Sequence, residues 1–159
     1  MQRRELFSSL ASSFTKKEKQ EIIIRPPYYK DEEIFLTNCT ECDGVCSTVC
    51  EENIIVIKDD KTPVIDFSLN GCTYCDECAI ACPNEVLNIE DKKNINAKIE
   101  IDVSTCLAWN DTMCFSCKDP CFDDAIDFLG MFRPEINDNC TSCGFCIKVC
   151  PTQAIKLTQ

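Results

Sequence analysis

The sequence predicts a small α+β protein in which two similar units follow an N-terminal extension. Three observations indicate this fold class: the cysteines fall into four groups of four, one group recurs 68 residues further along the chain, and short apolar runs flank the groups. A chain of 159 residues has room for one ordinary domain or two very small ones. We therefore place the extension at residues 1–38, the first unit at residues 39–97 and the second unit at residues 98–159.

Sixteen cysteines in 159 residues are far more than proteins ordinarily contain, so the cysteines decide to which class of protein this chain belongs. The four groups are Cys39, Cys42, Cys46 and Cys50; Cys72, Cys75, Cys78 and Cys82; Cys106, Cys114, Cys117 and Cys121; and Cys140, Cys143, Cys146 and Cys150. No cysteine falls outside them. Units this small bury a low fraction of their surface and need additional cross-links, such as disulfides or bound metals, to be stable. The cysteine side chains are candidates for this role.

An internal repeat links the groups. The group that begins at Cys72 recurs in the group that begins at Cys140, and Pro83 corresponds to Pro151 at the same offset. The first and third groups correspond less closely, because a seven-residue loop at residues 107–113 widens the third. The chain therefore holds two copies of a unit that carries two cysteine groups.

Short elements are expected around the groups. The expected strands are residues 54–57 and 64–67 around a turn at 58–61, residues 98–101, residues 126–128 and 135–136, and closing strands at 86–89 and 154–157. Helical turns are expected after the runs at residues 75–78 and 143–146, with a polar linker at 90–94 between the units. Residues 1–24 are expected to be a separate tail, with a helical pattern around Phe7, Leu10 and Phe14.

The formal charge is −11, and it is uneven. Residues 1–38 carry seven Lys or Arg against six Asp or Glu, whereas residues 39–159 carry nine against twenty-one. This acidic body argues against nucleic acid, whose phosphates require basic side chains, and it suits docking on a basic partner surface. The chain has no histidine, which removes the commonest general base and any histidine metal ligand.

The N-terminus raises the question of export. Arg3 and Arg4 resemble the start of a twin-arginine signal, which an apolar segment should follow. The stretch at residues 8–17 is instead rich in serine and ends in two lysines. No apolar run approaches the roughly 20 residues of a membrane span. We therefore expect a cytoplasmic protein without a membrane span.

The second and fourth groups both follow the pattern C-x2-C-x2-C-x3-C-P, which is the run that binds [4Fe–4S] clusters in bacterial ferredoxins. Three thiolates on a tight loop reach three irons of one cubane. The fourth lies one helical turn further on, points away and reaches the other cluster. The proline after it fixes the exit of the chain. Two groups per unit therefore predict two clusters with crossed ligation.

Crossed ligation assigns all sixteen cysteines to four [4Fe–4S] clusters. Cluster one takes Cys39, Cys42, Cys46 and Cys82; cluster two takes Cys72, Cys75, Cys78 and Cys50; cluster three takes Cys106, Cys114, Cys117 and Cys150; and cluster four takes Cys140, Cys143, Cys146 and Cys121. The first group departs from the run in the three residues between Cys42 and Cys46 and in Glu51 at the proline position. The third departs in its widened loop and in Phe122 at that position.

Three other interpretations use the same cysteines. Zinc sites with four thiolates also use C-x2-C pairs, but they usually separate two pairs by a longer stretch. A disulfide scaffold would require secretion, for which the chain has no usable signal. A [3Fe–4S] cluster is the alternative at either irregular group, because ligand number and spacing set the cluster type. With no histidine and no substrate-binding motif, we expect no catalytic residues and no enzyme activity.

Residues outside the ligands carry smaller predictions. Trp109 is expected to be a packing or surface residue, with partner binding as the alternative. Tyr74 and Phe145, which lie inside the cysteine runs, are expected to shield clusters from water. Residues 25–29, Arg-Pro-Pro-Tyr-Tyr, are expected to form a rigid extended joint.

Several stretches resemble one family over most of the chain. They are residues 25–27, Arg-Pro-Pro; residues 35–43, Phe-Leu-Thr-Asn-Cys-Thr-Glu-Cys-Asp; residues 50–54, Cys-Glu-Glu-Asn-Ile; residues 106–109, Cys-Leu-Ala-Trp; and residues 117–121, Cys-Lys-Asp-Pro-Cys. Together with Arg3, Arg4 and the last cysteine group, they resemble the NapF family, the ferredoxin-type accessory proteins of periplasmic nitrate reductase systems. The three-residue gap between Cys42 and Cys46 departs from the two that are usual in that family.

The resemblance implies a cytoplasmic protein with four [4Fe–4S] clusters that contacts the precursor of the nitrate reductase catalytic subunit before export. The role it implies is maturation of that subunit, through its iron–sulfur centre or through electron supply during assembly. Two alternatives stay open: a polyferredoxin that carries electrons to another oxidoreductase, and an interaction module whose clusters are structural. The resemblance, and not the cysteine spacing, supplies the partner and the role.

Overall fold

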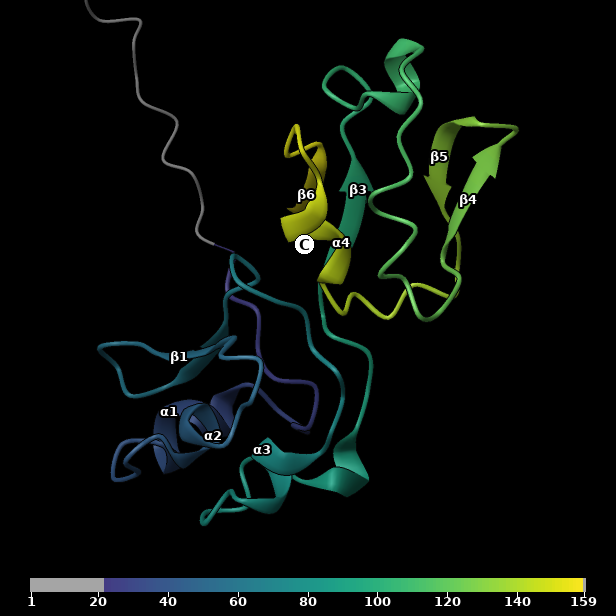
Figure 1. Ribbon diagram of the computed structural model, residues 1–159. Helices are drawn as coiled ribbons and strands as arrows, with labels where there is room; N and C mark the ends of the chain where they lie inside the picture. The colour runs from purple at the N-terminus through teal and green to yellow at the C-terminus, as the bar shows by residue number, and fades with distance from the viewer. Residues whose placement is uncertain (1–21, 159) are drawn as a thin grey trace, which may run out of the picture.

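The computed structural model describes residues 22–158 (Figure 1). Residues 1–21 and Gln159 lie outside the described part, and so does the helical pattern expected around Phe7, Leu10 and Phe14. In chain order the elements are α1 (Glu33–Asn38), α2 (Val45–Thr48), β1 (Ile55–Ile57), β2 (Pro63–Ile65), α3 (Glu77–Ile80), the 3-10 turn η2 (Ile89–Asp91), β3 (Lys98–Ile101), the 3-10 turn η3 (Ala108–Asn110), β4 (Ile126–Leu129), β5 (Phe132–Ile136), α4 (Phe145–Val149) and β6 (Ile155–Thr158). Within the described residues, no helix is long and apolar enough to cross a membrane.

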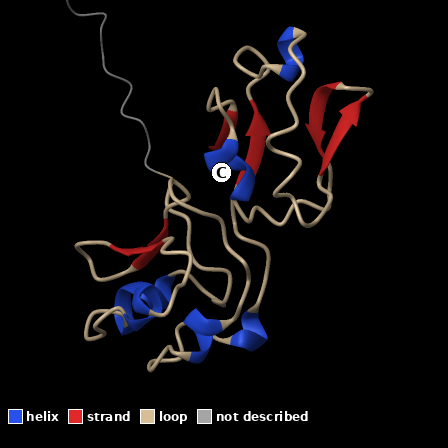
Figure 2. Ribbon diagram, viewed as in Figure 1, coloured by secondary structure: helices blue, strands red, loops and turns tan. Residues whose placement is uncertain are grey.

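The described chain forms two halves, an N-terminal half of residues 22–97 and a C-terminal half of residues 98–158, which lie beside each other in Figure 1. Each half contains one antiparallel hairpin, drawn in red in Figure 2, and short helical turns next to its cysteines. Helical turns were predicted after residues 75–78 and 143–146; the structure has helical turns there, but α3 and α4 begin within those stretches, at Glu77 and Phe145.

The N-terminal half is built on the hairpin of β1 and β2. The two strands pair antiparallel, with Ile55 opposite Ile65. The turn between them is closed by Lys58 N, which donates to Thr62 O at 3.0 Å, and by Thr62 N, which donates to Asp60 Oδ1 at 2.9 Å. Aspartate favours turns because its side chain accepts from the backbone two residues on. The hairpin predicted from the two apolar runs around a polar turn is confirmed.

The C-terminal half holds two antiparallel pairs. β3 pairs with β6, so the first and last strands of this half close on each other, with Ile99 opposite Leu157. β4 pairs with β5, and the register shifts between Phe128 and Leu129. Gly130 turns this hairpin with a φ of +66°, a left-handed conformation that glycine adopts without strain. These pairs confirm the strands predicted at residues 98–101, 126–128, 135–136 and 154–157.

The strand predicted at residues 86–89 is wrong. The segment instead bends into η2, and the side chain of Asn88 caps this turn by accepting a hydrogen bond from Glu90 N at 2.9 Å. A strand at residues 86–89 would have to pair with residues 26–29. Two of those residues are prolines, which have no N–H to donate to a strand ladder. What remains is the hydrogen bond from Asn88 N to Tyr28 O at 2.7 Å.

The segment at residues 25–29 lies inside the core of the N-terminal half. The buried Arg25 donates through Nη1 to Thr62 Oγ1 at 2.7 Å, and its guanidinium carbon lies 4.8 Å from the ring centroid of Phe35. Tyr29 meets the same ring edge-on, with the centroids 5.2 Å apart. The predicted joint therefore contributes core side chains, although it precedes the first cysteine.

Buried thiols belong to both hydrophobic cores. Cys39, Cys46 and Cys78 pack among the apolar residues of the N-terminal half. Cys117 and Cys146 pack against the strands of the C-terminal half. A buried cysteine behaves as a small apolar residue, so these five candidate ligands are also part of the core.

Candidate metal centres

All sixteen cysteines lie in the described part of the chain and all carry free thiols, so no disulfide joins any of them. They gather in four places. Each place takes three thiols from one run and one thiol from the other run of the same half. We call these places thiol sets one to four, with the same members and numbers as the four clusters predicted from the sequence.

Thiol set one brings Cys82 to the first run. Burial raises the pKa of the Cys39 thiol, and the charge of Cys82 raises it further, followed by that of Cys42. Burial likewise raises the pKa of Cys46 to about 12, again with Cys82 and then Cys42 adding to the effect. Charges influence a pKa in this way only at short range. Cys82 therefore lies beside the first run, although its own run begins at Cys72.

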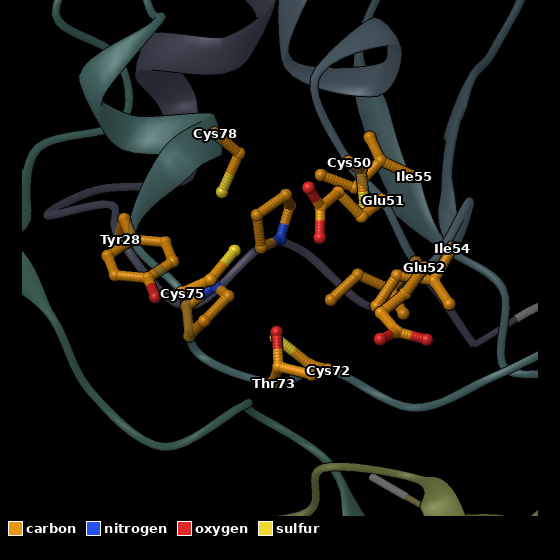
Figure 3. A pocket seen from close by; sticks show the side chains of 13 residues that line it. Tyr28, Cys50, Glu51, Glu52, Ile54, Ile55, Cys72, Thr73, Cys75 and Cys78 are labelled. Carbon is orange, nitrogen blue, oxygen red and sulfur yellow. The ribbon is translucent and has the colours of Figure 1, made fainter.

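Thiol set two surrounds a cavity in the N-terminal half. The four thiols in its lining are Cys50, Cys72, Cys75 and Cys78, and the apolar walls include Pro26, Pro27 and Ile54. Figure 3 shows the sulfur atoms of Cys75 and Cys78 directed into this space, with Cys50 on its other side. Among the sixteen thiols, Cys75 is the exposed one. This set therefore reaches the surface at one edge.

Thiol sets three and four each surround a cavity in the C-terminal half. The lining of one cavity includes Cys106, Cys114, Cys117 and Cys150, with Ile101, Pro134 and Ile155 among its apolar walls. The lining of the other includes Cys121, Cys140, Cys143 and Cys146, with Ile99, Ile126 and Ile136. In both cavities the fourth thiol comes from the other run, as in set two.

Left-handed backbone positions shape the cysteine loops. Tyr74 and Ser142 have φ values of +54° and +59°, and Asp76 and Gly144 have +68° and +87°. The members of each pair are 68 residues apart, so they occupy the same position of the repeat. Gly44, with a φ of +72°, precedes α2 in the first run. A left-handed residue turns the chain sharply, which allows three thiols of one short loop to line one cavity.

Backbone amides donate to several of the sulfur atoms. The donors are Tyr74 N to Cys72 Sγ at 3.4 Å, Leu87 N to Cys82 Sγ at 3.5 Å, Ala125 N to Cys121 Sγ at 3.3 Å, and Ala154 N to Cys150 Sγ at 3.2 Å. Three of these acceptors are the fourth cysteine of a run. An amide donor stabilises a thiolate, and around an iron–sulfur cluster such donors tune the reduction potential.

Burial makes thiolates costly in these sets. It raises the pKa of Cys78 and of Cys146 to about 12, and neighbouring thiols add to the effect. At Cys150 burial also acts upward, but hydrogen bonds from Ala154 and Thr152 outweigh it, so the pKa of this thiol is lowered. Four thiolates in one buried place need positive charge beside them, and an iron–sulfur core provides it.

The arrangement of the thiols around cavities suits a four-iron cubane. Zinc bound by four thiolates would lie about 2.3 Å from each sulfur. Across residues 22–158, no three cysteine, aspartate or glutamate side chains come close enough together to hold one ion. The thiols of sets two, three and four instead stand around cavities. A cubane of iron and sulfide occupies the space between its four thiolates in this way.

The widened loop of the third cysteine group packs against the hairpin of β4 and β5. Ala108 in η3 is buried, and Trp109 Nε1 donates to Pro134 O at 3.1 Å. The Arg133 guanidinium carbon lies 5.9 Å from the Trp109 ring centroid. These contacts confirm the packing role predicted for Trp109. Phe122, which replaces proline after this group, is 84% exposed.

Sequence reasoning missed two glycines, Gly71 and Gly144, that are buried where the halves meet. Tyr74 and Phe145, the residues expected to shield clusters, lie at the same contact: the Tyr74 hydroxyl donates to Thr141 O at 2.5 Å, and the Phe145 backbone lies against Gly71. A signal was present, because one glycine directly precedes a cysteine run and the other lies inside one. Nothing in that local pattern says that the two meet.

Comparison with known proteins first defines the class. Residues 134–156, which include the fourth cysteine run, match the family described as a 4Fe-4S binding domain, Fer4. The fold, the thiol sets and this match together define a ferredoxin-type iron–sulfur protein. Proteins of this class transfer electrons rather than catalyse reactions as enzymes.

Relatives that align over most of the chain then define the family. The ferredoxin-type protein NapF of Escherichia coli K12 is 36% identical over 137 residues, which cover 83% of this chain and 82% of that protein. NapF of Haemophilus influenzae KW20 Rd is 36% identical over 158 residues, covering 96% and 89%. The ferredoxin-type protein NapG of Escherichia coli K12 is 27% identical over 152 residues, covering 80% and 65%. The chain belongs to the NapF family of ferredoxin-type proteins.

Proposed function

We propose that this chain is a four-cluster iron–sulfur accessory protein, built from two tandem ferredoxin-like units, that assists maturation of the catalytic subunit of a periplasmic nitrate reductase. It acts in the cytoplasm, on the precursor of that subunit before export. The observation that carries the proposal is the crossed grouping of thiols in a chain of the NapF family. The grouping supports the cofactor, and the family supports the partner.

The equivalence of the halves supports a total of four clusters. Each half provides two thiol sets, and each set combines three thiols of one run with one of the other. Left-handed residues at equivalent repeat positions support a common design for the two units. The bound clusters supply one-electron chemistry, while the chain buries them and donates amide hydrogen bonds to their sulfur ligands.

The charge of the body supports docking on a basic surface of the partner. Residues 39–159 carry twenty-one acidic and nine basic side chains. An interface that depends on opposite charges should weaken as salt rises, because the screening length is about 8 Å at physiological ionic strength. The aim of that docking is to bring a cluster of this chain near the immature centre of the precursor.

An anaerobic pull-down tests the partner. Full-length protein with its clusters is immobilised, and the precursor of the nitrate reductase catalytic subunit is applied at low and at high salt. Capture that declines with salt supports the proposal, and the precursor of an unrelated exported enzyme serves as the control bait. Absence of specific capture at low salt would contradict the assembly role.

Deletion of the gene in its host separates maturation from simple electron supply. The proposal expects a catalytic subunit that fails to mature, and full-length protein supplied from a plasmid should restore it. If the deleted strain instead contains fully mature enzyme and only its electron supply is slower, the chain is a polyferredoxin electron carrier. That outcome would retain the clusters and discard the maturation role.

A further inference from the structure

The two halves meet through the backbone of two cysteine runs. Cys72 N donates to Cys143 O at 2.6 Å, so a residue of thiol set two is hydrogen bonded directly to a residue of thiol set four. Gly71 precedes the donor and Gly144 follows the acceptor. The contact therefore joins the second run to the fourth.

Glycine is required on both sides of this contact. A Cβ added at Gly71 would lie 2.5 Å from Phe145 N and 2.7 Å from Cys143 O, which are backbone atoms of the opposite half. A Cβ added at Gly144 would overlap the ring of Phe67. Backbone atoms cannot move aside as flexible side chains do. Any side chain at Gly71 therefore separates the two runs.

Further hydrogen bonds hold the halves at the same place. The Tyr74 hydroxyl donates to Thr141 O at 2.5 Å and accepts from Ile95 N at 3.1 Å. Ser142, which is buried, donates through Oγ to Ala97 O at 2.5 Å. These groups come from both runs and from the end of the N-terminal half. They bracket the contact between Cys72 and Cys143.

Within each half, the two thiol sets also lie next to each other. Cys46 of set one and Cys78 of set two are buried in the same hydrophobic cluster of the N-terminal half. In the same way, Cys117 of set three and Cys146 of set four are buried in the hydrophobic cluster of the C-terminal half. All four of these thiols are buried. The sets therefore follow one another in space in the order one, two, four, three.

We propose that the contact from Gly71–Cys72 to Cys143–Gly144 is the route for electrons between the halves, so that the four clusters act as one linear chain with clusters one and three at its ends. This inference rests on the four clusters of the proposed function. The order in space differs from the order of the cysteine groups along the sequence. Both irregular groups, the first and the third, then provide terminal clusters, where partners would exchange electrons.

The transfer across the contact is a one-electron step. Cys72 would hold the cluster that gives up one electron and Cys143 would hold the cluster that accepts it, so one cluster would be oxidised and the other reduced by one electron. No bond forms or breaks and no proton moves. The path runs through the side chain and the backbone amide of Cys72, across the hydrogen bond to the Cys143 carbonyl, and then through the Cys143 side chain. The electron comes from an external one-electron donor, dithionite in the experiment below.

Electron paramagnetic resonance of the full-length protein tests the contact. Wild type, Gly71→Ala and Tyr74→Phe are purified anaerobically, analysed for iron and sulfide, fully reduced with dithionite and recorded at low temperature. Gly130→Ala is the control for a glycine-to-alanine change, because a Cβ at Gly130 meets nothing within 4 Å.

Wild type and Gly130→Ala should show spin interactions that link all four clusters. Gly71→Ala should keep its iron but lose the interaction between the halves, which leaves two independent two-cluster patterns. Full iron with an unchanged spectrum in this variant would overturn the proposal. If Gly71→Ala loses iron, Tyr74→Phe decides: a weakened interaction supports the contact, and an unchanged one overturns it. Wild-type iron well short of four clusters would instead refute the proposed function.

Discussion

The two halves hold similar thiol sets but close their folds differently. In the C-terminal half, β3 and β6 form a continuous antiparallel pairing. In the N-terminal half, the corresponding segments are joined by separate hydrogen bonds, from Asn88 N to Tyr28 O at 2.7 Å and from Lys93 N to Pro27 O at 2.8 Å. The cause lies in residues 26–29, because prolines cannot donate to a ladder.

Aromatic packing takes the place of the ladder in the N-terminal half. Tyr28 and Phe35 are among the largest fully buried side chains of the described residues, and Arg25 lies over the Phe35 ring. The C-terminal half has a smaller core of five buried residues, two of them cysteines. The strand pairing and the core around a pair of thiol sets can therefore differ between the halves, while the grouping of the thiols stays the same.

The largest expected effect comes from removing a crossed thiol. Cys82→Ala should damage the cluster of Cys39, Cys42 and Cys46, because the structure places Cys82 beside them. Its paramagnetic resonance spectrum should therefore match that of Cys42→Ala, with iron lowered by up to about one cluster. A spectrum that matches Cys75→Ala instead would contradict the grouping.

The same substitution in the other half sharpens the comparison. Cys150→Ala should reproduce the change caused by Cys106→Ala, because these residues line one cavity. If the crossed ligation is found in one half and not in the other, the halves differ in cluster ligation as well as in strand pairing and core packing.

Core substitutions should destabilise one half without destabilising the other. Phe35→Ala should destabilise the N-terminal half by about 3–5 kcal/mol, and Ile155→Ala should destabilise the C-terminal half by about 2–5 kcal/mol. Thermal loss of cluster absorbance, followed with resonance spectra of partly heated samples, measures both. Phe35→Ala should release the clusters of sets one and two first, and Ile155→Ala those of sets three and four. Release of the same clusters in both variants would show that the halves do not unfold separately.

A smaller effect should follow from the buried arginine. Arg25 Nη1 donates to Thr62 Oγ1 at 2.7 Å and to Pro63 O at 2.8 Å. Arg25→Lys loses the planar donor group, so we expect a loss of about 1.5–3 kcal/mol, typical of hydrogen bonds to a charged group. Chemical denaturation under anaerobic conditions gives the value. Lys156→Arg, at an exposed position of the other half, is the control and should be neutral.

The smallest expected effect is at the widened loop. Trp109→Phe removes the donor to Pro134 O but retains an aromatic ring, so it should cost about 1 kcal/mol and leave every cluster in place. The same denaturation experiment measures it. Loss of cluster three in this variant would mean that the loop positions its thiols through Trp109.

Local spacing was enough to predict much of this molecule. The hairpins, β3 and β6 follow from apolar alternation, and the thiol groupings agree with the crossing expected of the cysteine runs. These features depend on residues close in sequence or on a repeat that is visible in it. They can therefore be predicted without knowing how the two halves pack against each other.

Long-range packing could not be predicted in the same way. The missing strand at residues 86–89 depends on prolines some sixty residues earlier, and the burial of Arg25 depends on Thr62. The contact of Gly71 with Phe145 joins the two halves. No periodicity within one segment reports such partners, because each segment alone satisfies its local preferences.

The central claim is that four crossed thiol sets bind four [4Fe–4S] clusters. It is tested most directly by iron, sulfide and zinc analysis of protein expressed in its own host and purified anaerobically, with the concentration taken from amino-acid analysis. The account predicts about sixteen iron and sixteen inorganic sulfide per chain, in a brown protein. Zinc without inorganic sulfide, or iron sufficient for only two clusters, would contradict it.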